Sequence, residues 1–216
     1  MSSWIQRRRK DQYYRLAKVR GYRSRAAYKL LQTTRTYGII KPGYIVVDLG
    51  CAPGGWLQVA REILGPQGLV LGVDIEPVIP IEYPNVKILE SDAHSPDIIE
   101  RILAETKGPV DTLLSDLAPS IIGAWEVDHA RQVDLAETAL QIARGVLKKG
   151  GCVLIKLFQG PELKRFEEEA RLVFDASRLL KPKASRPESS EIYFLGLGFK
   201  LQWPSSLNTR AGTLSH

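Results

Sequence analysis

Residues 46–56 constrain the fold more than any other part of the sequence. They begin as an apolar strand that ends near Asp48, and a turn with three glycines follows, namely Gly50, Gly54 and Gly55. Glycine has no Cβ and tolerates a positive φ, so the backbone of such a turn can lie close to a ligand. The helix predicted to start at the turn adds unpaired backbone N–H groups at the same place. The segment therefore predicts a small-molecule site built on a strand, a turn and a helix.

Strands and helices alternate along the rest of the chain. The hydrophobic pattern predicts strands at 44–49, 69–74, 86–89, 110–116, 152–158, 176–180 and 191–196. It predicts helices at 24–37, 55–64, 96–106, 127–147 and 161–174, the first of them capped by Ser24. Such alternation is typical of an α/β protein in which helices cover both faces of one doubly wound, mostly parallel sheet.

The length and composition fit one domain of this kind. The chain has 216 residues, of which 44% are hydrophobic, enough for a sizeable core. We expect a basic segment at 1–23, the folded domain at 24–202 and a polar tail at 203–216. The apolar runs are too short to span a membrane, and no apolar signal-peptide core follows the start. The two cysteines form no disulfide framework, which favours the reducing cytoplasm. Two cysteines and three histidines also offer little material for a metal site, so we expect no bound metal.

Positive charge is concentrated near the N-terminus. The net charge is +6, and between residues 1 and 25 the only acid is Asp11. The basic residues there are Arg7, Arg8, Arg9, Lys10, Arg15, Lys18, Arg20, Arg23 and Arg25, and they are interleaved with Tyr13, Tyr14 and Tyr22. Because clustered positive charge attracts polyphosphate and tyrosine stacks on bases, the segment predicts contact with RNA. A solvated basic terminus is the alternative interpretation.

The residues around the glycine turn limit the choice of ligand. Asp74 ends the next strand, where a carboxylate can bind the ribose diol of a dinucleotide or of S-adenosylmethionine. Ala52 and Pro53 interrupt the glycine spacing of a dinucleotide site, and a carboxylate at Asp48 suits a ligand that carries a positive charge. Asp92 follows the third strand, where it could bond an adenine edge or simply cap the next helix.

Four charged residues stand where packing alone would not place them. Lys29 lies within the first helix, Asp116 ends a strand, Lys156 interrupts an apolar run and Glu191 begins the last strand. Asp116 and Lys156 fall near strand ends that line the ligand crevice in sheets of this type. A buried lysine is costly unless it is paired or functional. As alternatives, Lys156 could extend its amine from a strand end and Lys29 could be solvated.

On these residues and on the segments around them, the chain resembles the RrmJ/FtsJ-type RNA 2′-O-ribose methyltransferases. The matching segments run in order from about residue 20 to 200 and are Ser24-Arg-Ala-Ala-Tyr-Lys-Leu30, Lys41-Pro-Gly43, Asp48-Leu-Gly-Cys-Ala-Pro-Gly-Gly-Trp56, Ser115-Asp-Leu-Ala-Pro119, Ile155-Lys-Leu-Phe-Gln-Gly160, and Ser185-Arg186 with Glu191-Ile-Tyr193. The resemblance implies a Rossmann-like methyltransferase sheet with an antiparallel last strand. It also implies a catalytic tetrad of Lys29, Asp116, Lys156 and Glu191. The implied S-adenosylmethionine contacts are Gly54, Trp56, Asp74, Asp92 and Asp116, to which the turn adds Asp48, Gly50, Pro53 and Gly55.

The implied reaction is methyl transfer to a ribose 2′-hydroxyl, a weak nucleophile that must lose a proton. Lys156 is the expected activating group, either as a base or as a cation that stabilises the developing alkoxide. A lysine near its usual pKa of about 10.4 is protonated, and the sequence leaves the two roles open. Trp125, in the loop after the catalytic strand, could stack on a base or cover the core.

The resemblance also bears on the substrate. The compact single-domain form resembles enzymes that methylate a uridine of large-subunit ribosomal RNA, and transfer RNA is the alternative substrate. A non-catalytic RNA-binding assembly protein with a relic cofactor pocket is an alternative class. A nicotinamide-dependent oxidoreductase fits less well because the glycine spacing is interrupted. We expect a monomer that binds RNA and no membrane.

Overall fold

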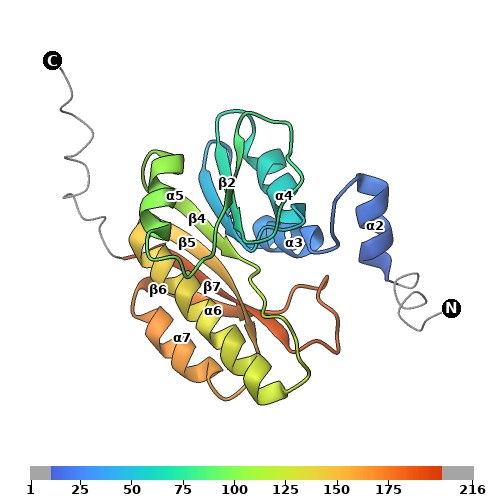
Figure 1. The fold of residues 1–216 in the computed structure, drawn as a ribbon, viewed down its shortest axis with the longest axis vertical. Helices are drawn as coiled ribbons and strands as arrows, with labels where there is room; N and C mark the ends of the chain where they lie inside the picture. The colour runs from blue at the N-terminus through green and yellow to red at the C-terminus, as the bar shows by residue number, and fades with distance from the viewer. Residues whose placement is uncertain (1–10, 201–216) are drawn as a thin grey trace.

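The computed structural model describes residues 11–200, and one mixed sheet lies at its centre (Figure 1). Within these residues the strands are β1 (Ile45–Leu49), β2 (Leu69–Asp74), β3 (Val86–Glu90), β4 (Val110–Ser115), β5 (Leu147–Phe158), β6 (Phe174–Leu180) and β7 (Glu191–Phe199). The helices are α2 (Gln12–Arg20), α3 (Ala27–Tyr37), α4 (Gly55–Leu64), α5 (Ile98–Thr106), α6 (Trp125–Val146) and α7 (Leu163–Arg171). The strand order is β3-β2-β1-β4-β5-β7-β6.

The strand directions confirm the expected Rossmann-like sheet. β1 is parallel to β2 and β4, β2 is parallel to β3, and β4 is parallel to β5. β7 lies antiparallel between β5 and β6. Because β7 is reversed, its first residues meet the last residues of β5, and Tyr193 lies opposite Lys156 while Glu191 lies opposite Phe158.

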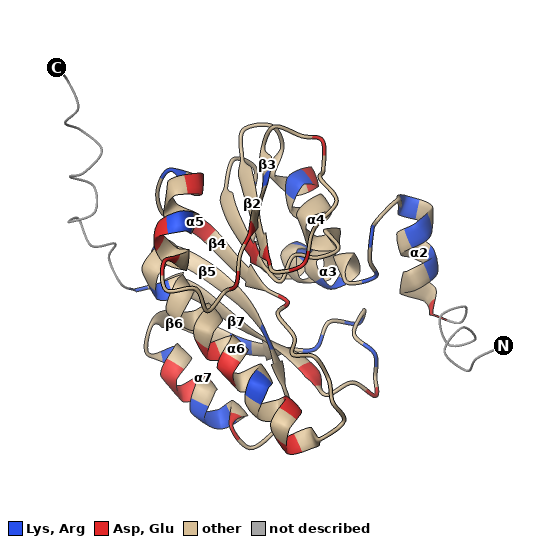
Figure 2. Cartoon of the chain, in the orientation of Figure 1, with Lys and Arg blue, Asp and Glu red and all other residues tan. Residues whose placement is uncertain are grey.

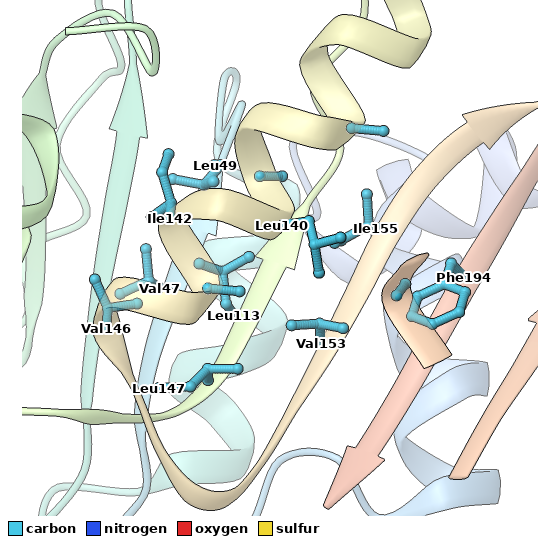
Figure 3. Close-up of a cluster of buried hydrophobic side chains, with 14 of the residues drawn as sticks. Val47, Leu49, Leu113, Leu140, Ile142, Val146, Leu147, Val153, Ile155 and Phe194 are labelled. Carbon is cyan, nitrogen blue, oxygen red and sulfur yellow. The ribbon is translucent and has the colours of Figure 1, made fainter. Parts of the chain in front are cut away.

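Successive side chains of a strand point to opposite faces of the sheet, so the strands contribute to two separate hydrophobic cores. Val46 and Leu114 pack with α3 and α4 on one face. Their neighbours Val47 and Leu113 pack with α5, α6 and α7 on the other face. Figure 3 shows α6 laid across the strands of this second face. Each fully buried aliphatic side chain contributes roughly 1.5–3 kcal/mol, so both faces stabilise the sheet that carries the site.

One boundary differs from expectation at β5, which begins at Leu147 rather than at Cys152. Leu147 pairs with Val110 before the glycine pair at 150–151, and the register shifts between Val110 and Thr112. Gly150 has φ +81°, so the glycines bend the strand instead of separating it from the helix. The predicted helix at 127–147 therefore ends at Val146.

Further boundaries differ at α7 and α3. Phe174 begins β6 rather than ending the preceding helix, and it lies opposite Phe199, to which β7 extends. Gly196 allows this extension, because a Cβ there would lie 2.7 Å from the Phe174 ring. The assignment of Ser24 as a helix cap is wrong. Helix α3 begins at Ala27 after a tight turn, and it has no side-chain cap.

The part of the basic segment that the structure describes forms helix α2, which the hydrophobic pattern did not predict. The Asp11 carboxylate accepts a hydrogen bond from the Tyr14 N–H at 3.1 Å and caps the helix. Gly21, at φ 73°, ends it in the left-handed conformation. Figure 2 shows the basic bands of this helix at the side of the molecule. The basic residues at 7–10 and the tail at 203–216 lie outside the described residues.

Among residues 11–200, no helix is both long enough and apolar enough to cross a membrane.

Candidate active site

The glycine turn after β1 comes close to the chain that follows β4. Gly50 has φ +75°, and a Cβ on it would lie 2.9 Å from the backbone nitrogen of Leu117. Gly54 has φ 105° and precedes the first residue of α4, Gly55. Only glycine meets both demands, a left-handed backbone and a close neighbour, at position 50. The turn therefore brings the start of α4 and the end of β4 to the same place.

Arg23 holds this turn from outside. Its guanidinium donates to the carbonyl oxygens of Pro53 at 3.1 Å and Pro80 at 2.9 Å, and also to that of Ile79. Arg25 is engaged as well, because it pairs with Asp11 and donates to the Ala184 carbonyl. These two arginines of the basic segment thus stabilise the domain itself, whereas Arg15, Lys18 and Arg20 on α2 are exposed.

A cavity of about 310 Å³ lies at the ends of β1, β2 and β4. Four of the predicted cofactor residues line it together, namely Gly50, Asp74, Asp92 and Asp116. The Asp74 carboxylate accepts hydrogen bonds from the Ala52 N–H at 2.8 Å and the Glu76 N–H at 2.9 Å. A carboxylate has about four acceptor sites, so Asp74 is oriented by these bonds and retains capacity for a diol.

Asp92 lies on the exposed rim of the cavity and is held by His94. The Asp92 carboxylate accepts from the His94 backbone N–H at 2.9 Å, and this bond is the main reason that the pKa of Asp92 is lowered. The His94 ring also lies 2.9 Å from the Asp134 carboxylate on α6. Burial lowers the pKa of His94, but the hydrogen bonds to Asp134 and Asp92 outweigh it, and the net shift is upward.

Asp48 lies beneath the turn and is fully buried. Neither of its carboxylate oxygens has a hydrogen-bond partner among the described residues. Burial, followed by repulsion from Asp116 and Asp74, raises the pKa of Asp48 well above its usual value. A buried acceptor without a hydrogen-bond partner costs folding free energy. A positive charge in the nearby cavity would offset part of that cost.

Lys156 and Asp116 form a close ion pair beside the cavity. The Lys156 Nζ lies 3.1 Å from Asp116 Oδ1, and it also donates to the Asp116 carbonyl at 2.5 Å. Burial by itself raises the pKa of Asp116, but Lys156 and then Lys29 outweigh it, and the pKa lies below its usual value. Asp116 is therefore ionised at neutral pH.

Lys29 and Glu191 form a second ion pair next to the first. The Lys29 Nζ lies 2.6 Å from Glu191 Oε1 and 2.7 Å from Oε2, so α3 is tied to the start of β7. The Ser185 hydroxyl donates to Glu191 Oε1 at 3.1 Å. The structure thus brings together all four residues of the predicted tetrad.

Tyr193 joins the two pairs and was not predicted as a site residue. Its hydroxyl donates to Asp116 Oδ1 at 2.7 Å and accepts from Lys29 Nζ at 3.2 Å. Burial, then repulsion from Asp116 and Glu191, raises its pKa well above the usual value, so the phenol keeps its proton. The period of a strand gave a usable signal, because Tyr193 is two residues from Glu191 and shares its face.

Trp56 and Gly55 lie apart from the cavity lining. The Trp56 indole is buried, donates to the Ala26 carbonyl at 2.8 Å and lies 5.9 Å from the Tyr193 ring. A Cβ on Gly55 would lie 2.3 Å from the Ser24 hydroxyl, so this glycine lets the turn before α3 approach the start of α4. At the start of α4, what these two positions can offer a ligand is backbone N–H groups.

The fold and this site together define a Rossmann-like methyltransferase. The chain belongs to the FtsJ-like methyltransferase family, whose model matches residues 22–199. It is 45% identical over 195 residues to the ribosomal RNA large subunit methyltransferase E of Methanocaldococcus jannaschii, covering 89% of this chain and 80% of the relative. The enzyme of the same name from Archaeoglobus fulgidus is 45% identical over 192 residues, covering 89% and 97% of the two chains.

Solved structures share the architecture. A Plasmodium falciparum protein assigned as a ribosomal RNA methyltransferase superposes with a TM-score of 0.74 at 27% identity, covering 82% of this chain and 98% of that one. Fibrillarin of Methanococcus jannaschii, a pre-rRNA processing protein, shares the fold alone, with a TM-score of 0.52 at 18% identity, covering 76% and 70%.

Membership of this family implies S-adenosylmethionine as the methyl donor, and the residues present fit that group. The unpaired Asp48 carboxylate and its acidic neighbours favour a cationic ligand such as a sulfonium with an ammonium group. Gly50 lines the cavity and keeps the backbone of the turn there free of a side chain, whereas Gly54 makes room for Arg23 outside the turn. Asp74, which lines the cavity, would supply the acceptor for a ribose diol.

Proposed function

We propose that this protein is an S-adenosylmethionine-dependent 2′-O-ribose methyltransferase that acts on a uridine of large-subunit ribosomal RNA. One observation carries the proposal: Lys156, paired with Asp116, stands at the edge of the cavity that fits the cofactor. The two relatives at 45% identity are named ribosomal RNA large subunit methyltransferase E, which supports the RNA class. The choice of uridine rests on the resemblance to the compact single-domain enzymes.

The hydrogen bonds of Lys156 suit the removal of a proton from a hydroxyl. To act as a base, Lys156 must first release the extra proton of its ion pair to solvent. The neutral amine then has two N–H groups and one lone pair, and its bonds to the carbonyl and to the carboxylate of Asp116 use the two N–H groups. The lone pair is then left for the 2′-hydroxyl proton. When S-adenosylmethionine is bound, it supplies an electrophilic methyl group. After transfer, Lys156 holds the proton as an ammonium next to the ionised Asp116, which stabilises the charge.

The second ion pair positions the acceptor side of this site. Glu191 receives bonds from Lys29 and Ser185, so its carboxylate is fixed on the strand that faces Lys156. The Tyr193 hydroxyl accepts from Lys29, the partner of Glu191, and donates to Asp116, so it links the two ion pairs. A rigid constellation of this kind lowers the barrier by orientation, which is the main requirement of an in-line displacement.

Basic surface near the site favours RNA as the partner. Helix α2 exposes Arg15, Lys18 and Arg20. A groove of about 490 Å³ between α3 and the chain after β6 is lined by cations that include Arg35 and Lys183. Hydrogen bonds from Gln32 of α3 to the Tyr13 hydroxyl and from the Ala184 N–H to Gln32 join these two regions. We infer that the RNA backbone follows this basic surface, bound by a monomer in the cytoplasm.

The test is a map of ribose methylation in ribosomal and transfer RNA from cells with and without the protein. We expect one 2′-O-methyluridine of large-subunit ribosomal RNA to disappear on deletion and to be restored by the purified enzyme with tritiated S-adenosylmethionine. Loss of a transfer RNA site instead would move the substrate to the alternative class. An unchanged map in both RNAs, with no transfer in vitro, would contradict enzymatic function and favour a relic pocket.

A further inference from the structure

Three flat side chains lie against one another beside the catalytic strands. The Trp125 ring lies 5.6 Å from the His129 ring at an interplanar angle of 16° and 6.4 Å from the Phe158 ring at 20°. Trp125 begins α6, and its side chain is 49% exposed. His129 lies one helical turn further on and is 5% exposed. The nearly parallel rings of His129 and Phe158 thus support one part of the indole, and the rest of it is exposed at the surface.

This aromatic platform is built rather than incidental. Both ring nitrogens of His129 lack a hydrogen-bond partner among the described residues, so its place is explained by packing alone. Gly160 makes room for it, because a Cβ there would lie 2.2 Å from the imidazole. The buried Asp128 carboxylate accepts from the N–H groups of Ile122 and Gly123, both at 3.0 Å. These bonds fix the loop that leads into Trp125.

The platform lies next to the tetrad. Phe158 is two residues beyond Lys156 on β5, so both side chains leave the same face of the sheet. Phe158 also lies opposite Glu191 in the ladder. Gln132, one turn beyond His129 on α6, donates to the Lys156 carbonyl at 3.0 Å. Phe158 links Trp125 to the strand that carries Lys156, and Gln132 links α6 to Lys156 itself. A base stacked on Trp125 would therefore lie close to the residues of the tetrad.

We propose that the exposed part of the Trp125 indole stacks on a nucleobase of the RNA, at or beside the nucleotide that is methylated. This inference rests on the proposed function for the identity of the substrate. The indole is polar only at its N–H and offers a broad π surface, which suits a base better than a phosphate. The basic surface already described would bind the backbone, while Trp125 fixes the reacting nucleotide.

The matched set of variants is Trp125→Ala, Trp125→Tyr and, as a control, Tyr83→Ala. Tyr83 is an aromatic residue of similar exposure, at 45%, that precedes β3 at the opposite end of the parallel strands. We expect Trp125→Ala to weaken binding of a single-stranded RNA oligonucleotide by about 5- to 150-fold, the range measured for one stacked base. Trp125→Tyr should recover most of the loss and Tyr83→Ala should cause none. S-adenosylmethionine affinity should be unchanged in all three, and circular dichroism should show that each variant is folded.

Abasic RNA separates stacking from a structural effect. Removing the stacked base should weaken binding to the wild-type protein, and the same removal should have little further effect on Trp125→Ala. Additive losses at every position, or full RNA affinity in Trp125→Ala, would overturn the proposal. Because binding is measured without turnover, these outcomes are independent of the methylation map. A protein that binds through Trp125 without transferring methyl groups would contradict the proposed function and leave the platform intact.

Discussion

The Tyr193 hydroxyl donates a hydrogen bond to Asp116 Oδ1 at 2.7 Å, and this bond connects two ion pairs that the sequence keeps far apart. The same hydroxyl accepts a hydrogen bond from Lys29 Nζ at 3.2 Å. The four charges of the tetrad therefore form one network rather than two pairs. Networks of buried polar groups are stronger than isolated bonds, but each member that loses its partner becomes costly.

Replacing the tyrosine tests this connection. In Tyr193→Phe the ring is retained, while Asp116 loses a donor and Lys29 loses an acceptor. A bond to a charged group is worth about 1.5–3 kcal/mol, so we expect kcat to fall by roughly 10- to 100-fold. Cofactor affinity, measured by calorimetry, should change little. Unchanged kcat would show that the two ion pairs act independently.

Lys156→Ala should abolish methyl transfer while cofactor affinity stays nearly intact. The Lys156 amine contacts Asp116 at the catalytic edge and does not line the cofactor cavity. Asp116→Ala is the informative comparison, because Asp116 lines that cavity and pairs with Lys156. We expect it to lose both activity and cofactor affinity. Single-turnover transfer and equilibrium binding measure the two effects separately, and near-normal turnover in Lys156→Ala would remove this lysine from the mechanism.

Asp48→Asn should change how the stability of the cofactor-free protein depends on pH. The pKa of Asp48 is raised in the folded state, mainly by burial. The folded state thus keeps a proton that the unfolded chain releases near pH 4, and wild-type stability declines as the pH rises from about 4 through the folded-state pKa. The asparagine variant lacks this decline. Denaturant unfolding from pH 4 to 9 should therefore show a pH-dependent difference between the two proteins. Parallel curves would contradict the assignment.

The same substitution should weaken S-adenosylmethionine binding. When a cationic ligand binds, Asp48 can release its proton and offset the positive charge, whereas a neutral asparagine cannot. Neither oxygen of Asp48 has a hydrogen-bond partner among the described residues. We expect roughly a tenfold loss, about 1.4 kcal/mol, by calorimetry. S-adenosylhomocysteine, which lacks the sulfonium charge, provides the control and should lose less.

Gly50→Ala and Gly43→Ala form a matched pair that isolates close approach from backbone strain. Both glycines have a positive φ, at +75° and +79°. A Cβ on Gly43 meets nothing within 4 Å, whereas one on Gly50 meets the Leu117 backbone at 2.9 Å. Gly43→Ala should cost about 1–2 kcal/mol of unfolding free energy, the usual cost of a left-handed residue. Gly50→Ala should cost more and should also weaken cofactor binding. Equal losses would mean that the approach of Leu117 is unimportant.

Replacing Arg15, Lys18 and Arg20 together by glutamine should weaken RNA binding and reduce its dependence on salt. For each phosphate of a single strand that the variant no longer neutralises, the slope of log K against log salt should become shallower by about 0.7. Lys164→Gln on α7 is the control, because this lysine is also exposed and only pairs with Glu168 at 3.8 Å. A slope that stays constant in the triple variant would exclude α2 from the RNA interface.

Local signals predicted the cofactor side of the site. The helix at 55–64 matches at both ends, because a glycine turn and Gly65 punctuate it. Asp74 and Asp116 were predicted from strand ends, where topology alone brings polar residues together. The missed features depend on tertiary contacts. Leu147 joins β5 because Val110 pairs with it, and α2 is too polar to show an apolar stripe. Tyr193 was not predicted as a site residue because a tyrosine within an apolar strand is typical of the hydrophobic core.

The reversed direction of β7 has a consequence for how such enzymes diversify. A parallel strand would present its end to the site, but β7 presents its beginning, immediately after the segment at 181–190 that borders the groove on α3. Ser185 within the segment donates to Glu191, and the Ala184 N–H donates to Gln32 of α3. Length changes after Ser185 would leave these bonds and the ladder of β5 with β7 in place, so Glu191 and Tyr193 would keep their register. If the segment contacts RNA, as proposed, exchanging residues 186–190 between family members should alter the RNA target while the catalytic residues stay in place.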